Sequence, residues 1–472
     1  MKKSRLIYIV VCCCILLKVF SAPVFAQEQK FDDLSVSSGC NTLDGQVPLY
    51  GNDKMLKSAR AAFLYEVNSQ TILYAYNPDE AMSPASLVKI MTCLVVLDNC
   101  DISEKVVVSE SAMATIPKGS ATLKLQPGEE FTVDQLLYGL MVGSANDAAV
   151  VLAEHAAGSQ GAFVNLMNKL SREIGCVNTV YTNAHGLNDS TQITTARDVA
   201  RLVNYAMQSE QFMTYFGKSN YEMPATEFSE ARPLETSNYL NNTGTVNFFD
   251  SRCTGGRTGI SSDNRRSIVV TANSNGLSYI AVVLSSETEY NDRNLVKYYG
   301  SYEEAKELFK LGFGSQAIYQ VLYDGQILSQ FNVVDGKSHV AVGPLNAAYS
   351  VLPSDTKMED IMIRFGNLDG TLQAPVKEGE QISTAEVWYG SVCIAYSPVV
   401  TLNGAQKLDH VNMLKNRYGG GSKVWVIIAI VILVIAVGAG VVYIFGRTFR
   451  GMQNAKMQRR YRKRRSDRRR TR

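Results

Sequence analysis

The sequence predicts an α+β domain, a small all-β domain after it, and one transmembrane helix near the C-terminus. Residues 58–314 combine helical patterns with pairs of strand patterns, and residues 315–402 alternate strand-like runs with Asp-Gly turns. Residues 424–445 contain no charged side chain. At about 1.5 Å per residue, this run spans roughly 33 Å, which is enough to cross a bilayer.

The first 26 residues have the features of a signal peptide. A basic start at residues 2–5 precedes an apolar stretch at residues 6–17. Residues 24–26 then place small side chains, Val24 and Ala26, at the two positions that a signal peptidase reads. An N-terminal membrane anchor is the alternative, but the apolar stretch is too short for one. We therefore predict that the chain is exported and cleaved after Ala26.

The α+β domain begins after a polar, irregular lead-in at residues 27–57. Residues 61–67 and 71–76 have strand patterns around a short polar turn, which predicts a hairpin. Ser83 followed by Pro84 then predicts the start of a helix, because serine is a favoured N-cap and proline is favoured at the first helical position.

Further helices are expected at residues 133–141 and 145–157, at the amphipathic stripe of residues 163–174, and at residues 195–208. Strands are expected next. Residues 267–273 and 278–284 flank a turn-rich link and predict a strand pair.

A short helix is predicted at residues 302–311, ending at Gly312, and the all-β domain of residues 315–402 follows it. Residues 403–423 have the composition of a linker to the membrane.

The C-terminal tail is strongly basic. Residues 447–472 carry 13 basic side chains and one acidic side chain, so we expect residues 446–472 to lie in the cytoplasm and to contact anionic lipid. The remaining body, residues 27–446, holds 30 basic and 43 acidic side chains, a net charge of −13. An acidic ectodomain of this kind gives no sign of a nucleic-acid partner.

Six cysteines remain after cleavage, and their spacing argues against a disulfide framework. Cys93 and Cys100 lie about 10.5 Å apart along one predicted helix, which is beyond disulfide reach. We expect mostly free thiols among the six, which are Cys40, Cys93, Cys100, Cys176, Cys253 and Cys393. No group of cysteines and histidines has metal-ligand spacing, so we predict no metal and no cofactor.

Ser86 and Lys89 are three residues apart in the helix predicted to start near Ser83. This spacing places both side chains on one face, where the amine can reach the hydroxyl. The first helical turn also favours a developing negative charge. An ordinary helix serine and a surface lysine are the alternative, and the same S-x-x-K pattern recurs at Ser354 and Lys357 in a polar loop. The motif alone therefore does not distinguish a serine–lysine pair in a cleft from this alternative.

Two other patches add to this motif. Ser144 and Asn146 lie two residues apart at a helix start, where capping alone explains both. Arg257, Thr258 and Gly259 lie in a glycine-rich strand entry. The order S-x-x-K, S-x-N and basic-Thr-Gly, however, is the signature of penicillin-recognising serine enzymes.

Longer segments carry the same resemblance, namely residues 84–92, 136–140, 144–149, 152–155, 183–187, 195–198 and 280–284. Together they resemble the low-molecular-weight penicillin-binding proteins, which are serine-type D-alanyl-D-alanine carboxypeptidases. The resemblance covers residues 58–400. It implies a β-lactamase/transpeptidase-like catalytic domain, an antiparallel sheet with helices, at residues 58–314, followed by a small all-β domain before the membrane anchor.

The resemblance also implies roles for the motif residues. Ser86 would be the nucleophile and Lys89 its base, because a lysine near other cations and away from water loses pKa and can accept the serine proton. Ser144 would relay a proton to the leaving amine. Asn146 would bind the substrate backbone and position Lys89.

The remaining substrate-binding positions implied by the resemblance lie in the glycine-rich strand entry, together with the N–H group of Ser86. The N–H groups of Ser86 and Ile260 would hold the oxyanion. Arg257 and Thr258 would bind the free carboxylate of the substrate, and Gly259 lies between them and Ile260.

The implied reaction removes the terminal D-alanine from a peptidoglycan stem pentapeptide through an acyl-enzyme at Ser86, and β-lactams would be inhibitors that trap this serine. The implied location is the cell membrane, with one span, an extracytoplasmic catalytic domain and a cytoplasmic tail.

Two departures from the family pattern leave alternatives open. Arg257 replaces the usual lysine, which keeps the charge but removes any proton-relay role. Residues 261–266 replace a run of small residues. The chain is therefore alternatively a catalytically impaired penicillin-binding or wall-binding protein, or an endopeptidase, transpeptidase or β-lactamase on the same site. No convincing water-activating glutamate for a β-lactamase is evident.

Overall fold

The computed structural model describes residues 43, 48–50, 54–116, 119–187, 189–293, 296–366, 371–408, 426, 428–445, 447 and 456–457. The predicted signal peptide, most of the lead-in, Cys40, most of the linker and most of the basic tail lie outside these residues, and the expectations for them stay predictions.

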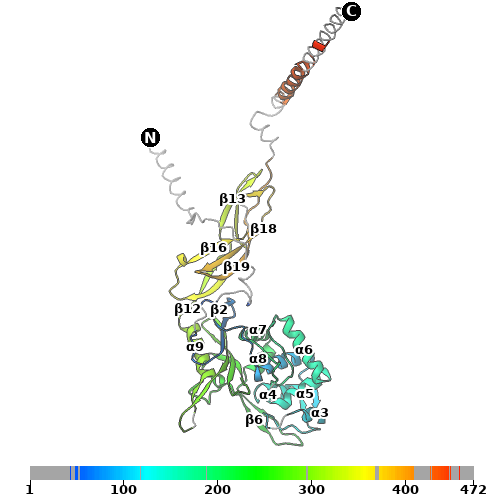
Figure 1. The fold of residues 1–472 in the computed structure, drawn as a ribbon, viewed down its shortest axis with the longest axis vertical. Helices are drawn as coiled ribbons and strands as arrows, with labels where there is room; N and C mark the ends of the chain where they lie inside the picture. The colour runs from blue at the N-terminus through cyan, green and yellow to red at the C-terminus, as the bar shows by residue number, and fades with distance from the viewer. Residues whose placement is uncertain are drawn as a thin grey trace, which may run out of the picture. The chain divides into compact units, whose positions relative to one another are not determined.

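The elements of the α+β part follow one another along the chain as shown in Figure 1. They are β1 (Ala61–Glu66), β2 (Thr71–Tyr76), the 3₁₀ turn η1 (Ala85–Leu87), α2 (Val88–Asn99), β3 (Lys105–Val107), α3 (Glu110–Ala114), β4 (Glu130–Thr132), α4 (Val133–Met141), α5 (Asn146–Ala157), α6 (Gln160–Glu173), α7 (Ala196–Ala206), α8 (Glu210–Phe216), β5 (Asn220–Met223), β6 (Arg232–Glu235), η2 (Tyr239–Asn241), β7 (Cys253–Ile260), β8 (Arg266–Ser274), β9 (Leu277–Ser286), β10 (Thr288–Tyr290), β11 (Val296–Tyr299) and α9 (Gly300–Gly314).

A five-stranded antiparallel sheet lies at the centre of this part, with the strand order β2-β1-β9-β8-β7. The β1–β2 hairpin and the β8–β9 pair confirm the two strand pairs predicted from the sequence. The glycine-rich segment predicted to enter these strands is itself a strand, β7, and it forms an edge of the sheet. One side of β7 is therefore open to other partners.

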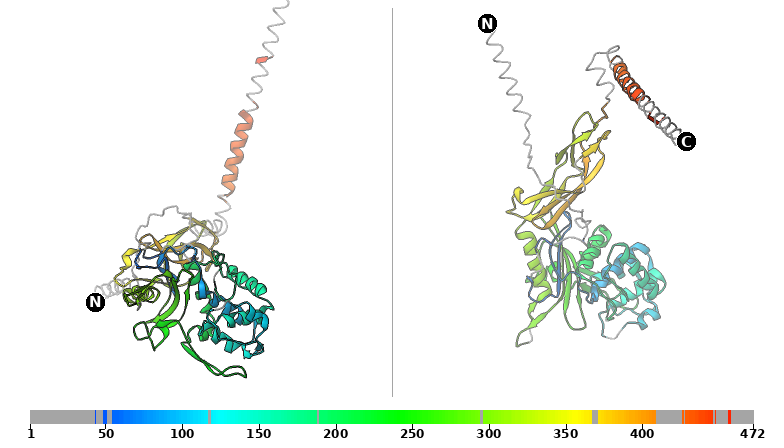
Figure 2. Two further views of the ribbon diagram at one scale, coloured as in Figure 1. Left: turned by 60° about the horizontal axis from the view of Figure 1, so that its bottom comes forward. Right: turned by 45° about the horizontal axis from the view of Figure 1, so that its top comes forward.

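The sheet is buried on both faces, because successive side chains of a strand point to opposite sides. From β1, Phe63 and Tyr65 pack into an apolar cluster that includes residues of α2, α4, α5 and α7. Ala62 and Leu64 pack into a second cluster with residues of α9. Figures 1 and 2 show α9 on one side of the sheet and the helices α4, α5 and α6 on the other.

Most predicted helices are confirmed with small changes at their ends. The helix predicted at residues 133–141 is α4, whose N-cap Thr132 forms a capping box with Gln135. The helices predicted at residues 145–157, 163–174 and 195–208 are α5, α6 and α7.

The predicted helix start at Ser83 is wrong. The chain forms a 3₁₀ turn after Pro84, and the α-helix begins only at Val88. Ala85 has a φ of +45°, in the left-handed region, so regular α-helix cannot include it. Ser86 therefore lies in the turn just before α2 and not inside the first turn of an α-helix.

The predicted end of the helix near Gly312 is also wrong, because α9 continues to Gly314. A Cβ atom at position 312 would lie 2.8 Å from the ring of Tyr279. Gly312 thus allows α9 to pack closely on β9, and it does not end the helix.

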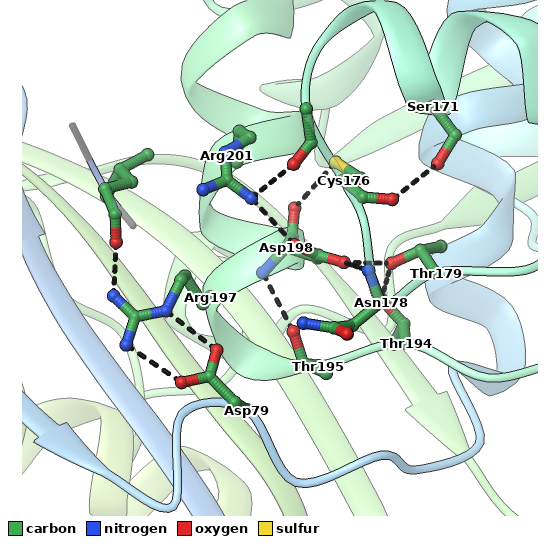
Figure 3. Close-up of polar contacts among 12 residues, drawn as sticks. Asp79, Ser171, Cys176, Asn178, Thr179, Thr194, Thr195, Arg197, Asp198 and Arg201 are labelled. Atoms are coloured by element: carbon green, nitrogen blue, oxygen red, sulfur yellow. Dashed lines mark hydrogen bonds and ion pairs between the residues drawn. The ribbon is translucent and has the colours of Figure 1, made fainter. Parts of the chain in front are cut away.

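The N-terminus of α7 is tied to the segment that precedes it (Figure 3). Its N-cap, Thr195, accepts a hydrogen bond from the N–H of Asp198. The Asp198 carboxylate accepts hydrogen bonds from the N–H of Asn178 and the hydroxyl of Thr179, both at 2.8 Å. This network holds residues 178 and 179, at the start of the segment 178–187.

The chain after α9 consists mostly of strands, which confirms the all-β character predicted for residues 315–402. The elements are β12 (Gln316–Leu322), β13 (Ser329–Val334), β14 (Val340–Pro344), β15 (Ala348–Pro353), η3 (Met358–Asp360), β16 (Ile361–Phe365), β17 (Thr371–Gln373), β18 (Gln381–Tyr389) and β19 (Val392–Thr401). β12 pairs with β15, and β18 pairs with β16 and β19, all antiparallel.

The contacts divide the chain into two compact units. Of the described residues, the first unit comprises those up to 328 and those within 343–368 and 381–400, and the second comprises those within 329–342 and 369–380 and those after 400. In the second unit, β13 pairs antiparallel with residues of β14 and parallel with β17.

One helix of the described chain, Ile428–Phe445, is apolar and long enough to cross a membrane. Its 18 residues extend about 27 Å. It lies within the span predicted at residues 424–445, and it is a candidate membrane anchor by its length and composition.

The cysteines largely follow the prediction. Cys93, Cys100, Cys176 and Cys253 are free thiols. Cys393 is an exception to the mostly free thiols that the sequence predicts, because it is disulfide-bonded.

Candidate active site

Ser86 and Lys89 meet as the S-x-x-K spacing predicts. Ser86 lies in the turn η1, and Lys89 lies in the first turn of α2, where its side chain has no solvent exposure. The Lys89 Nζ atom lies 3.2 Å from the Ser86 Oγ atom. The alternative of a surface lysine is therefore wrong, and the pair forms a direct hydrogen bond.

The amine of Lys89 has two other acceptors, both closer than Ser86. They are the Oδ1 atom of Asn146 and the backbone carbonyl of His185, each at 2.7 Å from Nζ. A neutral lysine amine has two hydrogens and one lone pair. The charged amine donates to all three oxygens, whereas a neutral amine can keep its two hydrogens on the two short contacts and turn its lone pair to the Ser86 hydroxyl.

The loop that supplies the His185 carbonyl is held in place by Asn183 and Gly186. The Asn183 Oδ1 atom accepts the N–H of Gly186 at 2.7 Å, which makes a tight turn. Gly186 has a φ of +84°, and a Cβ atom there would lie 2.0 Å from the carbonyl oxygen of Ala85. Glycine is therefore required for this loop to approach the turn that carries Ser86.

Asn146 is the first residue of α5, but neither it nor Ser144 caps that helix with its side chain, since the N-cap is Ala145. Capping therefore does not explain either residue. The neighbouring Asp147 is buried, and its carboxylate accepts the N–H groups of Leu123 and Leu125 at 3.0 and 3.1 Å. These bonds hold the 121–125 loop against the start of α5.

Ser144 faces Arg257, which comes from the edge strand β7. Arg257 is 1% exposed, and its Nη2 atom donates a hydrogen bond to the Ser144 hydroxyl oxygen. Its Nη1 and Nε atoms donate to the carbonyls of Met141, at 2.7 Å, and of Ser86, at 3.3 Å. One guanidinium thus joins the three segments that carry Ser86, Ser144 and the end of α4.

Arg257 is a buried cation that makes no ion pair with a carboxylate among the described residues. The next residue on the strand, Thr258, places its hydroxyl 2.5 Å from the hydroxyl of Ser237. Positive charge and hydroxyl groups thus lie together along β7. This combination suits an anionic group of a ligand.

Gly259 and Ile260 continue β7 beside Ser86. A Cβ atom at position 259 would lie 3.1 Å from the Ser86 nitrogen, so a side chain there would crowd the N–H of that serine. The Ile260 side chain is half exposed. The strand then turns through residues 261–266, where Ser261 N–H bonds to the Arg265 carbonyl, and this segment forms the hairpin to β8.

The electrostatic setting lowers the pKa of Lys89. Burial is the largest cause, and the charge of Arg257 acts in the same direction, while Asp147 opposes both. The pKa of Lys89 therefore falls well below 10.5. Burial, together with the charge of Lys89, also lowers the pKa of His185 to about 4, so the imidazole is neutral near pH 7.

All eight residues named by the sequence motifs belong to this neighbourhood, whereas the second S-x-x-K pattern does not. Ser354 and Lys357 are exposed and flank a turn after β15. Sequence reasoning gave no role to the His185 carbonyl, Gly186 or Asp147. The first two lie in segment 183–187, which carried the family resemblance without an assigned function.

Comparisons with known proteins point in one direction. Residues 52–288 match the peptidase family S11, described as D-alanyl-D-alanine carboxypeptidase, and residues 319–407 match the C-terminal domain of penicillin-binding protein 5. The first match covers half of the chain.

Individual proteins are similar over most of their length. A D-alanyl-D-alanine carboxypeptidase DacF of Bacillus subtilis is 27% identical over 78% of this chain and 92% of its own. A D-alanyl-D-alanine carboxypeptidase DacA of Haemophilus influenzae is 31% identical over 69% of this chain and 79% of its own. The crystal structure of penicillin-binding protein 5 from Haemophilus influenzae is 27% identical, covers 76% of this chain and 100% of its own, and superimposes with a TM-score of 0.62.

Proposed function

Because the chain belongs to peptidase family S11, the D-alanyl-D-alanine carboxypeptidases, we propose that it removes the terminal D-alanine from peptidoglycan stem pentapeptides. The observation that carries this proposal is the contact between Ser86 Oγ and the buried Lys89 Nζ at 3.2 Å. A serine next to a lysine of lowered pKa is an activated nucleophile that needs no histidine.

Acylation begins with Lys89. Its neutral amine keeps two hydrogens on Asn146 and the His185 carbonyl and takes the proton of Ser86. The Ser86 oxygen attacks the carbonyl carbon of the penultimate D-alanine, and a C–O bond forms. The N–H groups of Ser86 and Ile260 stabilise the negative charge that develops on the carbonyl oxygen.

The peptide C–N bond then breaks, and the proton that Lys89 took from Ser86 passes through the Ser144 hydroxyl to the leaving amine, which returns Lys89 to its neutral form. Arg257 donates to the Ser144 oxygen, so the hydroxyl hydrogen of Ser144 is free to point to the substrate. Arg257 cannot itself relay the proton, because a guanidinium stays protonated. It orients Ser144 and adds positive charge.

The terminal carboxylate of the substrate lies by Arg257 and Thr258. Arg257 uses three of its five N–H groups on protein oxygens, which leaves two for a ligand. Asn146 bonds to the substrate backbone with its amide N–H groups while its Oδ1 holds Lys89. Gly259 leaves room for the acyl group beside the Ser86 N–H.

Water then hydrolyses the acyl-enzyme and regenerates Ser86. β-Lactams imitate the D-alanyl-D-alanine end, acylate the same oxygen and leave it blocked. The C–N bond that breaks in a β-lactam belongs to a ring, so the leaving group stays attached and hinders the water.

For the location, we propose a signal peptide at residues 1–26, one membrane span at residues 424–445, an extracytoplasmic catalytic part and a cytoplasmic tail. The apolar helix Ile428–Phe445 and the basic residues after it support this topology.

The test is release of free D-alanine from a D-alanyl-D-alanine-terminated pentapeptide by the full chain in mild detergent. Release by the parent chain and by the surface variant Ser354→Ala, but not by Ser86→Ala, supports the proposal. No release from a folded parent chain that binds penicillin instead indicates an impaired binding protein. Cleavage of cross-linked muropeptide dimers without release from the pentapeptide indicates an endopeptidase.

A further inference from the structure

A second cluster of chemically active side chains lies away from Ser86. The ligand atoms of Cys100, Glu104 and His155 all lie within 4.8 Å of one another. The Nε2 atom of His155 lies 2.8 Å from the Oε2 atom of Glu104. We propose that these three side chains bind a zinc-class divalent cation.

The donor set selects the kind of metal. One thiolate, one imidazole and one carboxylate are the ligands that Zn²⁺ takes in proteins, and three protein ligands leave a fourth position for water. The sulfur disfavours Mg²⁺ and Ca²⁺, which prefer oxygen ligands. The cluster therefore differs from a group of surface carboxylates, which would attract many cations weakly.

The backbone positions of the ligands are fixed by three helices. Cys100 is the C-cap of α2, with its N–H bonded to the Val96 carbonyl at 2.9 Å. His155 lies in the last turn of α5. The Glu104 carbonyl accepts the N–H of Val133, the first residue of α4, at 3.0 Å.

The local field also favours a cation. The C-terminal ends of α2 and α5 both lie at the cluster, and each helix end carries a partial negative charge. The Glu104 carboxylate contacts the His155 imidazole, and no lysine or arginine among the described residues forms a salt bridge with it. Exposed fractions of 24% for His155 and 45% for Glu104 leave the cluster open to solvent.

Burial and the Glu104 carboxylate raise the pKa of the Cys100 thiol to about 11. Zinc binds the thiolate form of cysteine, so metal binding releases the thiol proton to solvent. The thiolate and the carboxylate then carry one negative charge each and the imidazole is neutral, so the three protein ligands have a total charge of −2.

The site is structural in this proposal and not catalytic. Cys100 is eleven residues from Lys89, which is about 16 Å along a helix. The metal would join the C-terminal ends of α2 and α5, whose N-terminal ends carry Lys89 and Asn146. It would thus brace the two helices that hold the Lys89–Asn146 hydrogen bond, and the inference does not depend on the proposed peptidase activity.

The sequence did not reveal this cluster, because the expectation of no metal site came from residue spacing and from the small number of histidines. Cys100 and Glu104 are four residues apart, but His155 is 51 residues further along and reaches them only because α5 packs against α2. This separation resembles no short metal-binding motif.

The test uses the full chain in mild detergent, stripped of metal with a chelator and then titrated with Zn²⁺ or Co²⁺. We expect one Zn²⁺ per chain, a higher melting temperature with Zn²⁺, and a near-ultraviolet thiolate-to-Co²⁺ absorption band. The band should vanish in Cys100→Ser, and Zn²⁺ affinity should fall at least about tenfold in Cys100→Ser and in His155→Gln.

Cys253→Ser is the matched control, because it removes another partly buried free thiol that lies outside the cluster. It should keep the band and the affinity. If Cys100→Ser fails to fold, the Zn²⁺ affinities of His155→Gln and Glu104→Gln test the site instead, and both should be lower than that of the parent chain. No binding, or binding and absorption that are unchanged in the cluster variants, would overturn the site.

Discussion

Arg257 donates a hydrogen bond to the hydroxyl oxygen of Ser144 from a position that is 1% exposed to solvent. The same guanidinium bonds to the carbonyls of Met141 and Ser86. A lysine has one nitrogen on a flexible chain and cannot reach three acceptors in three directions with the same geometry. The arginine thus does more than preserve a charge, because it fixes the positions of the segments around the nucleophile.

The first prediction concerns this arginine. Arg257→Lys keeps the charge but loses at least one hydrogen bond made by a charged group, so the rate of acylation by a fluorescent penicillin should fall about tenfold. Arg257→Gln loses the charge as well, so its rate of acylation should fall about 100-fold or more. Arg265→Gln, on the adjacent hairpin and paired with Glu287, should react like the parent chain. Equal rates for Arg257→Gln and the parent chain would contradict the role of Arg257.

The second prediction concerns the pH dependence of acylation. Lys89 acts as a base only when neutral, and burial and then Arg257 lower its pKa. The acylation rate should therefore rise with pH through a midpoint well below 10.5. In Arg257→Gln one of the two causes is gone, so the midpoint should move to higher pH while burial keeps it below 10.5.

Stopped-flow or gel measurements of penicillin acylation across the pH range check both expectations. A midpoint that stays in place in Arg257→Gln would show that Arg257 does not act on Lys89. A midpoint at or above 10.5 would show that Lys89 is not the group that titrates.

The third prediction concerns stability in acid. The pKa of His185 is lowered from 6.5 to about 4, first by burial and then by the charge of Lys89. Between these values the unfolded chain binds a proton that the folded chain does not, so stability rises with pH in this window and is lost as the pH falls from 6.5 to 4. The full effect is roughly 3 kcal/mol.

Protonation of His185 also removes an acceptor, because its Nδ1 atom receives the N–H of Leu187 at 3.1 Å. His185→Gln should therefore flatten the loss of melting temperature between pH 6.5 and 4. His339→Gln, at a histidine outside the site, should leave the dependence of the melting temperature on pH unchanged. Parallel slopes for the parent chain and His185→Gln would contradict the assignment.

The fourth prediction concerns Gly186. A side chain at this position meets the Ala85 carbonyl at 2.0 Å and also requires a φ of +84°. Gly158, the C-cap of α5, has a similar φ of +74° with nothing within 4 Å of a Cβ atom. Gly158→Ala should cost about 1–2 kcal/mol of stability for the backbone alone.

Gly186→Ala should cost at least about 2 kcal/mol more than Gly158→Ala, because backbone has to move, and it should slow acylation by displacing the Ser86 turn. Melting temperatures and penicillin labelling of the two variants give the comparison. Equal stabilities would mean that the 186 loop does not press on the Ser86 turn.

The strands and long helices of the α+β part were predictable because their apolar periodicity is local. The β1–β2 hairpin, the β8–β9 pair and α4 appear where the patterns indicate. The start of α2 was not predictable in this way. Ala85 takes a φ of +45° in a turn that Gly186 and Gly259 press against, and these glycines are far away in the sequence.

The same distinction holds in the site. The Ser86–Lys89 contact joins residues only three apart, so the S-x-x-K spacing together with the order of the three motifs could predict it. The two short acceptors of Lys89 come from positions 146 and 185, and the partners of Arg257 come from positions 86, 141 and 144. Only the folded sheet and helices bring these groups together, which is why the His185 carbonyl had no predicted role.

The central claim is that Ser86 is the nucleophile. The most direct measurement is mass spectrometry of the penicillin-treated full chain, digested to locate the acylated residue. The mass of one penicillin should appear on the peptide that contains Ser86, should persist in Ser354→Ala, and should be absent in Ser86→Ala. An acyl group on another residue, or labelling that survives in Ser86→Ala, would contradict the account.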